Sequence, residues 1–269
     1  MSISRSLVTL PGVVAAAMLL SLPRGADAAC VTYQTVPDGR IRGPYTISNA
    51  TSDVAVQFQG VLGKSYSAEA MVVSTPFDAA SGSVSANWGG AGTLCPTSNV
   101  SGLRRTDIID PAPQASAASL VNYFRGSFTA GATNFYVFRI GNASATAVTI
   151  EVTITETTQF SPGWSTIGTY DTFYSILNTT RSTCSGVLTL YDTAGVAVTV
   201  ANLTVPPGAT TGTNTSAMGT VRNTTGTAKL THDCPPGAFL SEAAIANFSI
   251  NPPYFQFVHF EGTRDAKTH

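Results

Sequence analysis

Hydrophobic and polar residues alternate along most of the chain after Cys30, which is the pattern of half-buried β-strands. In the clearest run, residues 148–155, an aliphatic face alternates with a polar face. The aliphatic positions are Val148, Ile150, Val152 and Ile154. Similar alternation covers residues 54–58, 66–72, 136–140, 186–190 and 244–250. No long run with helical spacing interrupts these segments, so the pattern predicts an all-β protein.

Turn-forming residues separate the predicted strands. They occur at residues 129–133, 192–195, 206–208, 235–237 and 251–253. Short strands at this spacing predict two consecutive β-sandwich domains of the jelly-roll or Ig-like type. We place domain 1 at residues 29–158 and domain 2 at residues 159–260.

The remaining segments have less regular patterns. Residues 159–164 are expected to link the two domains, and residues 261–269 are expected to form a disordered tail. The Ala- and Ser-rich segment 113–121 is expected to form a helical turn.

The first 28 residues have the pattern of a cleaved secretory signal peptide. Arg5 precedes an apolar stretch at residues 7–22, and the small residues Ala26 and Ala28 flank a cleavage site. The stretch is shorter than the roughly 20 apolar residues of a membrane span. We therefore expect an exported protein, secreted, periplasmic or on the cell surface, with no membrane span after cleavage. The Ala-rich signal favours a bacterial source.

Charge excludes one class of partner. Only 11% of residues are charged, and the net charge of the chain is −1. The nearest approach to a basic run is the pair Arg104 and Arg105. Proteins that bind nucleic acid normally carry a basic stripe that displaces counterions, so we expect no nucleic-acid partner.

Four cysteines follow the predicted signal, and an even number in an exported chain predicts two disulfides. Three pairings are possible. We favour Cys30–Cys95 and Cys184–Cys234, because each pair then lies within one half of the chain. Lipidation of Cys30 is the alternative, although Asp27 fits poorly three positions before it. No two cysteines lie close together in the sequence, so the spacing does not favour a metal site.

Two segments resemble known families. Residues 53–155 resemble the β domain of the bacterial pre-peptidase C-terminal type, through GVLGKSY at 60–66 and FRGSF at 124–128. That resemblance implies an accessory jelly roll, which in the family usually accompanies an exported enzyme. Residues 161–260 resemble Ig-like modules of uncharacterised exported bacterial proteins, through SPGW at 161–164 and LYDTAG at 190–195. That resemblance implies an Ig-like sandwich and no particular activity.

Two motifs suggest catalysis or nucleotide binding, but neither fits. Residues 60–65 have two residues between their glycines, whereas a phosphate-binding loop of the Walker A type has four, so we expect a turn. His232 and Asp233 could form a base and its orienting carboxylate. Adjacent residues of a strand point to opposite faces, however, and the chain has no Gly-x-Ser-x-Gly nucleophile motif. We expect His232 to lie at a strand end near Cys234.

Acidic and aromatic residues suggest ligand binding. Asp107 and Asp110, with Asp53 or Asp78, could bind calcium, but their spacing matches no calcium loop, so no metal ligand is expected. Exposed aromatic rings can stack on sugars. The candidates are Trp88, Trp164, Tyr170, Tyr174 and Tyr254. Trp88, with glycines beside it, is predicted to be a glycan contact on an exposed loop, and Trp164 is predicted to pack at the domain junction.

Eight Asn-x-Ser/Thr sequons occur, which we attribute to a composition rich in Asn and Thr. They begin at Asn49, Asn99, Asn142, Asn178, Asn202, Asn214, Asn223 and Asn247. Together these observations predict an exported, non-catalytic β-sandwich protein with a structural, adhesive or envelope-associated role and no cofactor. Its expected partner is an envelope protein or an extracellular glycan. The alternative function is that of a carbohydrate-binding module.

Overall fold

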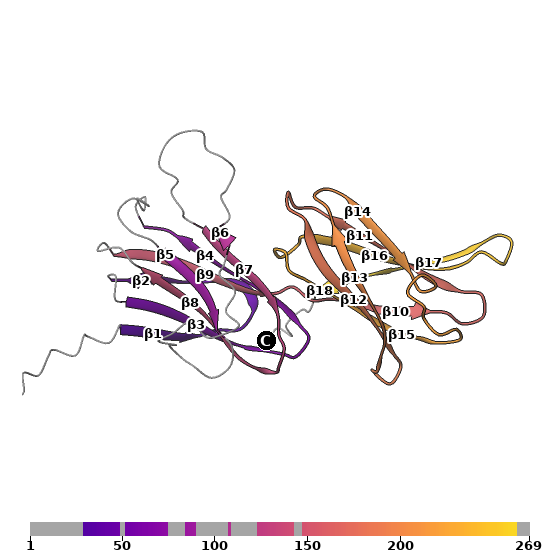
Figure 1. The fold of residues 1–269 in the computed structure, drawn as a ribbon, viewed down its shortest axis with the longest axis horizontal. Coiled ribbons are helices and arrows are strands. Elements are labelled where there is room, and N and C mark those ends of the chain that lie inside the picture. The colour runs from indigo at the N-terminus through magenta and orange to yellow at the C-terminus, as the bar shows by residue number, and fades with distance from the viewer. Residues whose placement is uncertain are drawn as a thin grey trace, which may run out of the picture.

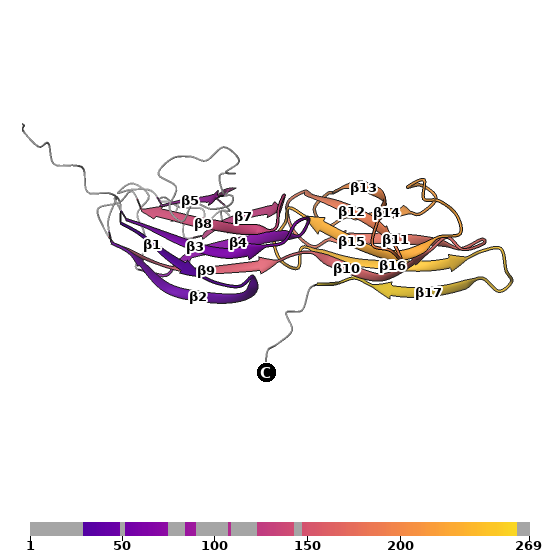
Figure 2. The same cartoon turned by 90° about the horizontal axis from the view of Figure 1, so that it is seen from below.

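The computed structural model describes residues 29–48, 52–74, 84–89, 107–108, 123–142 and 147–262. The regular elements in these ranges are all strands, and they form two consecutive β-sandwiches that lie end to end (Figure 1 and Figure 2). The predicted fold class is therefore confirmed. No helix in these ranges is long and apolar enough to cross a membrane. The predicted signal peptide and the predicted helical turn at 113–121 lie outside the described residues.

The first sandwich consists of two facing sheets. One sheet has the order β1-β3-β8-β5 and the other the order β2-β9-β4-β7-β6. β1 pairs with β3 in parallel, and the other pairings are antiparallel. The strands are β1 (Ala29–Gln34), β2 (Asp38–Ile47), β3 (Ser52–Gly60), β4 (Ser65–Val72), β5 (Val84–Gly89), β6 (Asp107–Ile108), β7 (Tyr123–Thr129), β8 (Asn134–Asn142) and β9 (Val148–Glu156).

The alternation in the sequence forms the core of this sandwich. The aliphatic positions of β9 are all buried, and the polar positions between them are half-buried. From the facing sheet, Val54, Phe58 and Phe138 join the same cluster. Phe58 and Tyr66 pack with ring centroids 5.2 Å apart, a distance typical of favourable aromatic pairs.

The second sandwich also consists of two sheets. One has the order β13-β12-β15-β10-β18 and the other the order β14-β11-β16-β17. The strands are β10 (Gln159–Ser165), β11 (Asp171–Asn178), β12 (Cys184–Asp192), β13 (Ala197–Val205), β14 (Thr210–Asn214), β15 (Thr225–His232), β16 (Phe239–Asn247), β17 (Tyr254–His259) and β18 (Glu261–Gly262). The predicted turns at 192–195, 206–208, 235–237 and 251–253 each connect two consecutive strands.

Two sequence predictions about β10 are wrong. Residues 159–164 are not a link but belong to β10, which pairs with β15. The pairing shifts register between Ser161 and Trp164, so Pro162 lies in a bulge, where a missing N–H costs little. Trp164 lies in the core of the second sandwich, not at the junction, and its indole N–H donates to Tyr191 O (2.9 Å) and Thr227 O (3.0 Å).

Thr157 and Thr158 connect the two sandwiches, and both are buried. Thr157 N–H donates to Ser65 O (2.8 Å), and Ser65 N–H donates to Thr158 Oγ1 (2.8 Å). Lys64 Nζ lies 3.0 Å from the Glu156 carboxylate beside them. The junction thus consists of two buried threonines between β9 and β10 that bond to Ser65 at the start of β4. β18 pairs with β10 next to it, so Glu261 and Gly262, the first two residues of the predicted tail, belong to a strand.

Candidate functional site

An exposed cluster of aromatic side chains lies on the outer face of β11, β16 and β17. Alternate residues of β11, Tyr174 and Ile176 among them, point into the core, so Phe173 points outward. In the register of the sheet, Phe173 is opposite Ala244, and Ala244 is opposite Phe257. Phe257 and Phe255 therefore project from the same outer face as Phe173.

The turn between β16 and β17 adds Phe248 to this cluster. Phe248 contacts Phe173 edge-on (centroids 5.7 Å apart) and Phe255 edge-on (5.3 Å). The rings remain accessible, since the exposed fractions are 60% for Phe248, 49% for Phe255 and 67% for Phe257. We call Phe173, Phe248, Phe255 and Phe257 the aromatic face. Exposed apolar patches of this kind commonly mark interaction sites.

The outer face of the opposite sheet has a different chemistry. There the outward positions of β15 and β13 include Thr227, Lys229 and Asn202. Lys229 Nζ lies 5.3 Å from the centre of the Tyr191 ring, within the range of a cation–π contact. The two faces of one sandwich thus differ: one carries the phenylalanines, and the other combines these polar residues with the exposed Val200.

The predicted sugar-stacking residues do not gather at one place. The structure places Trp88 in strand β5, paired with Phe138 of β8, and not in a loop. Trp164 and Tyr174 are core residues. Tyr254 is exposed and contacts Tyr170 edge-on at 5.9 Å. Of the predicted platform, only the Tyr170–Tyr254 pair therefore lies near the aromatic face.

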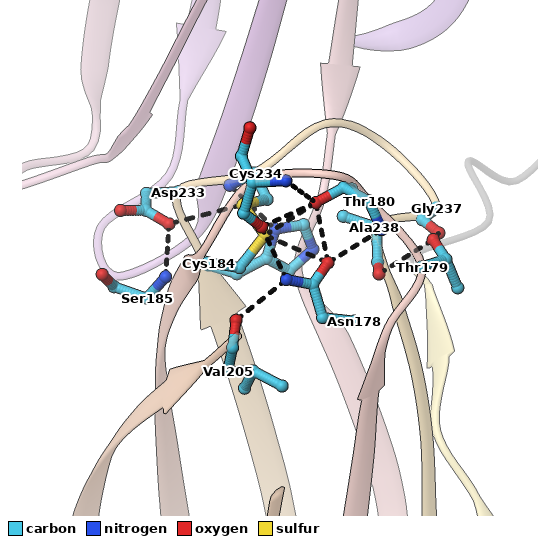
Figure 3. Close-up of a disulfide and its surroundings, with 12 residues drawn as sticks. Asn178, Thr179, Thr180, Cys184, Ser185, Val205, Asp233, Cys234, Gly237 and Ala238 are labelled. Atoms are coloured by element: carbon cyan, nitrogen blue, oxygen red, sulfur yellow. Dashed lines mark hydrogen bonds between the residues drawn. A yellow bond between two sulfur atoms is a disulfide. The ribbon is translucent and has the colours of Figure 1, made fainter. Parts of the chain in front are cut away.

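The Cys184–Cys234 disulfide is present, as predicted, at one end of the second sandwich (Figure 3). It joins the start of β12 to the segment after β15, and both cysteines are buried. Asn178, also buried, lies beside it and donates through Nδ2 to Ser182 O (2.7 Å) and Val205 O (2.8 Å). Of the other predicted disulfide, Cys30 lies in β1 and Cys95 lies outside the described residues. The Cys30–Cys95 pairing stays a prediction.

His232 does not form a catalytic pair with Asp233. It is the last residue of β15, as predicted, and its imidazole is buried against the Phe239 ring (centroids 4.9 Å apart). Burial lowers its pKa to about 4, a larger effect than the opposing influence of Asp233 and of backbone bonds to Cys234 and Thr157. The Asp233 carboxylate instead accepts a hydrogen bond from Ser185 N–H (2.7 Å). His232 is thus a neutral core residue near the junction.

The loop at residues 61–64 is a turn between β3 and β4, as predicted, and its amides are engaged within the protein. Leu62 N–H donates to Thr133 Oγ1 (3.0 Å), and Gly63 N–H donates to Ala130 O (2.7 Å). Lys64 Nζ binds Glu156. A phosphate-binding loop needs free amides and a free lysine, which this turn does not offer.

The remaining candidates are the proposed calcium ligands and the sequons. The side chains of the proposed calcium ligands Asp53, Asp78, Asp107 and Asp110 lie outside the described residues, and the described residues contain no cluster of metal-binding side chains. Two sequons are buried, because Asn178 and Asn247 pack inside the second sandwich. Asn202 and Asn223 are exposed.

Sequence reasoning missed the aromatic face. Residues 254–258 carry apolar side chains on both faces of one strand, which the alternation rule assigns to a strand buried on both sides. β17 is instead the last strand of its sheet. The signal that could have revealed the site is this two-sided apolar segment directly after a Pro-Pro turn. No model of a known protein family matches the chain, and no curated protein matches it either.

Proposed function

We propose that this protein is a non-catalytic, exported β-sandwich protein that acts by binding a component of the cell envelope, in a structural or adhesive role. The aromatic face is the observation that carries the proposal. It places three largely accessible phenylalanines on one rigid sheet, where contact with a partner would remove apolar surface from water.

The groups that could take part in catalysis are engaged within the protein, which favours a binding role. His232 is buried and neutral, and Asp233 is held by a backbone amide. Lys64 is held by Glu156. The groups that sequence motifs suggested for chemistry therefore stabilise the junction and the disulfide end of the second sandwich.

Retention on cell-envelope fragments from the producing organism tests this proposal. The purified protein should sediment with the fragments, and Phe248→Ser should raise the apparent dissociation constant about tenfold, the effect of about 1.4 kcal/mol of lost contact. Phe248 is the right target because it lies between Phe173 and Phe255. Leu62→Ser is the matched control, since Leu62 is equally exposed but belongs to the first sandwich.

Two results would contradict the proposal. One is equal retention of the Phe248 and Leu62 variants. The other is an enzymatic activity that purifies with the protein and survives to homogeneity.

A carbohydrate-binding function is the second candidate, and the exposed Tyr254 ring next to Tyr170 favours it. Aromatic rings offer sugars a flat apolar surface. A glycan array separates the two functions. Binding that is lost in Tyr254→Ala or Trp88→Ala, with an unchanged melting temperature, would indicate a glycan partner. If no glycan on the array binds, an envelope protein is the partner that the proposal retains.

A further inference from the structure

β17 leaves one of its edges without a neighbouring strand among the described residues. It is the outermost strand of the order β14-β11-β16-β17, and it is the lower outer strand of the second sandwich in Figure 2. The free edge of a strand presents N–H and C=O groups that can pair with another strand.

The backbone groups at this edge belong to the residues of the aromatic face. Phe260 N–H donates to Ser241 O of β16 (3.4 Å), and the direction of the N–H groups alternates along a strand. The amides of Gln256 and Val258 therefore point toward β16. Those of Phe255 and Phe257 point to the free edge.

The edge lacks the features that normally prevent strand pairing. Residues of β17 include no lysine, arginine or proline, although these residue types commonly protect exposed edges. Among the described residues, the contact of His259 Nδ1 with the Glu242 carboxylate (3.7 Å) joins β17 to its own neighbour β16. No like charges would oppose each other if two copies of β17 met.

We propose that β17 pairs antiparallel with β17 of a second copy of this chain, with Gln256 on the two-fold axis. In an antiparallel pair, two residues that lie opposite each other point to the same face of the sheet. Outward residues of β17, which have odd numbers, must therefore lie opposite odd-numbered residues of the partner subunit, so the numbers of two opposed residues add up to an even number. The register centred on Gln256 places Phe255 opposite Phe257 of the partner subunit. The two-fold axis repeats this pair, so Phe257 also lies opposite Phe255 of the partner subunit.

This register matches side chains well. On the other face of the seam, Tyr254 lies opposite Val258 of the partner subunit, and the two Gln256 side-chain amides between these pairs can bond to each other. The aromatic faces of the two copies become one surface. The inference rests on the proposed function, because it places the aromatic faces of two copies side by side on one envelope-binding surface.

The surface available sets the strength of the dimer. Tyr254, Phe255 and Phe257 are 44%, 49% and 67% exposed. At roughly 200 Å² for an aromatic side chain, they offer about 300 Å² per copy, and the strand backbone adds to it. That total lies in the class of small, transient interfaces. The dimer should therefore be weak and reversible, so the concentration series that tests it has to reach the upper micromolar range.

Light scattering across a micromolar concentration series, without envelope material, tests the dimer. The mass should rise from that of one copy toward that of two. Phe257→Lys should raise the dissociation constant at least about tenfold, because it places a charge within the apolar seam. Val200→Lys is the control, since Val200 is exposed on β13, the outermost strand of the other sheet.

Cysteine cross-linking tests the register without removing apolar surface. Gln256→Cys should give a disulfide-linked dimer under mild oxidation, since residues on the axis face each other directly. Thr204→Cys on β13 is the matched control and should stay monomeric.

Three outcomes would overturn the inference: a monomer at every concentration, equal weakening by Val200→Lys, or equal cross-linking at Thr204. The proposed function fails separately. A monomer that still sediments with envelope fragments would contradict the dimer alone, and a dimer that does not sediment would contradict the envelope role alone.

Discussion

His232 shows how one residue joins the disulfide end of the second sandwich to the junction. Its Nδ1 accepts a hydrogen bond from Cys234 N–H (3.3 Å), and its ring also bonds to the backbone of Thr157. The imidazole is 3% exposed, so a proton on it would be a buried charge. The burial that lowers the pKa therefore also links folding to pH.

We expect the free energy of unfolding to fall as the pH is lowered from about 6.5 to about 4. The folded pKa, about 4, lies below the unfolded value of 6.5, so the unfolded state binds more protons in that window. The contribution of His232 is complete above pH 6.5 and is lost as pH falls to 4, by about 3 kcal/mol in total.

Urea unfolding between pH 7 and pH 5 measures this effect in the range where most carboxylates stay ionised. His232→Gln should remove most of the slope. His259→Gln, at an exposed position, should keep it. A wild-type stability that is flat over this range would contradict a buried neutral His232.

Asn178 allows a second prediction at the residue scale. Its Nδ2 serves two carbonyls, and its Oδ1 accepts from Thr180 N–H (2.9 Å). Asn178→Ala leaves buried groups without partners and should cost about 2–4 kcal/mol in urea unfolding. Asn202→Ala, an exposed asparagine of another sequon, should change stability by less than about 0.5 kcal/mol. Similar effects at both sites would contradict the structural role of Asn178.

At the scale of the element, the bulge in β10 depends on a close approach of backbones. Gly226 pairs with Trp164 of β10 on one side and with Asp192 of β12 on the other. A Cβ atom at Gly226 would lie 1.8 Å from Tyr191 O. The same carbonyl accepts the Trp164 indole N–H, so a side chain here would displace both β12 and the tryptophan.

Gly226→Ala should therefore destabilise the second sandwich by about 3 kcal/mol, the upper range for overpacked sites. Gly163→Ala is the matched control, since a Cβ at Gly163 meets no atom within 4 Å. Thermal unfolding followed by tryptophan fluorescence gives both values, because Trp164 lies at the altered site. A small effect at Gly226 would mean that β12 and β15 can separate there without cost.

At the scale of the whole molecule, we expect the buried contacts of the junction to restrain the two sandwiches relative to each other. Thr157 and Thr158 are buried, and Ser65 bonds to both of them. Lys229 of the second sandwich lies close to the turn at residues 61–64 of the first sandwich. Its Nζ is 3.0 Å from the position that a Cβ atom at Gly63 would occupy. These contacts involve both linker residues, so we expect them to restrict hinge motion at Thr157 and Thr158.

Small-angle X-ray scattering should therefore fit a single elongated particle. A short Gly-Ser insertion after Thr158 should increase the maximum dimension and broaden the distance distribution, because it removes the buried contacts of the junction. The same insertion in the turn at residues 193–195 should change neither quantity. A wild-type profile that requires several arrangements of the sandwiches would contradict the restrained junction.

The strands were the most predictable part of this molecule, and their pairing was the least. Alternation in 148–154 and turn residues at 192–195 are local signals, and both gave the correct elements. Residues 159–164 were misassigned because Pro162 and Gly163 look like a link, whereas the bulge that accommodates them depends on β15. The aromatic face was missed for a related reason, since the position of β17 at an edge depends on the whole sheet order.

The direction of β1 determines at which end of the molecule the described chain begins. β1 runs parallel to β3, with Gln34 opposite Gln57, so Ala29 lies at the end of the first sandwich away from the junction. The last strand, β18, ends beside the junction. Neither end of the described chain reaches the far tip of the second sandwich (Figure 1), where the turn with Phe248 lies. A surface tether at the Ala29 end would therefore hold that tip outward, with the length of both sandwiches between the tip and the point of attachment.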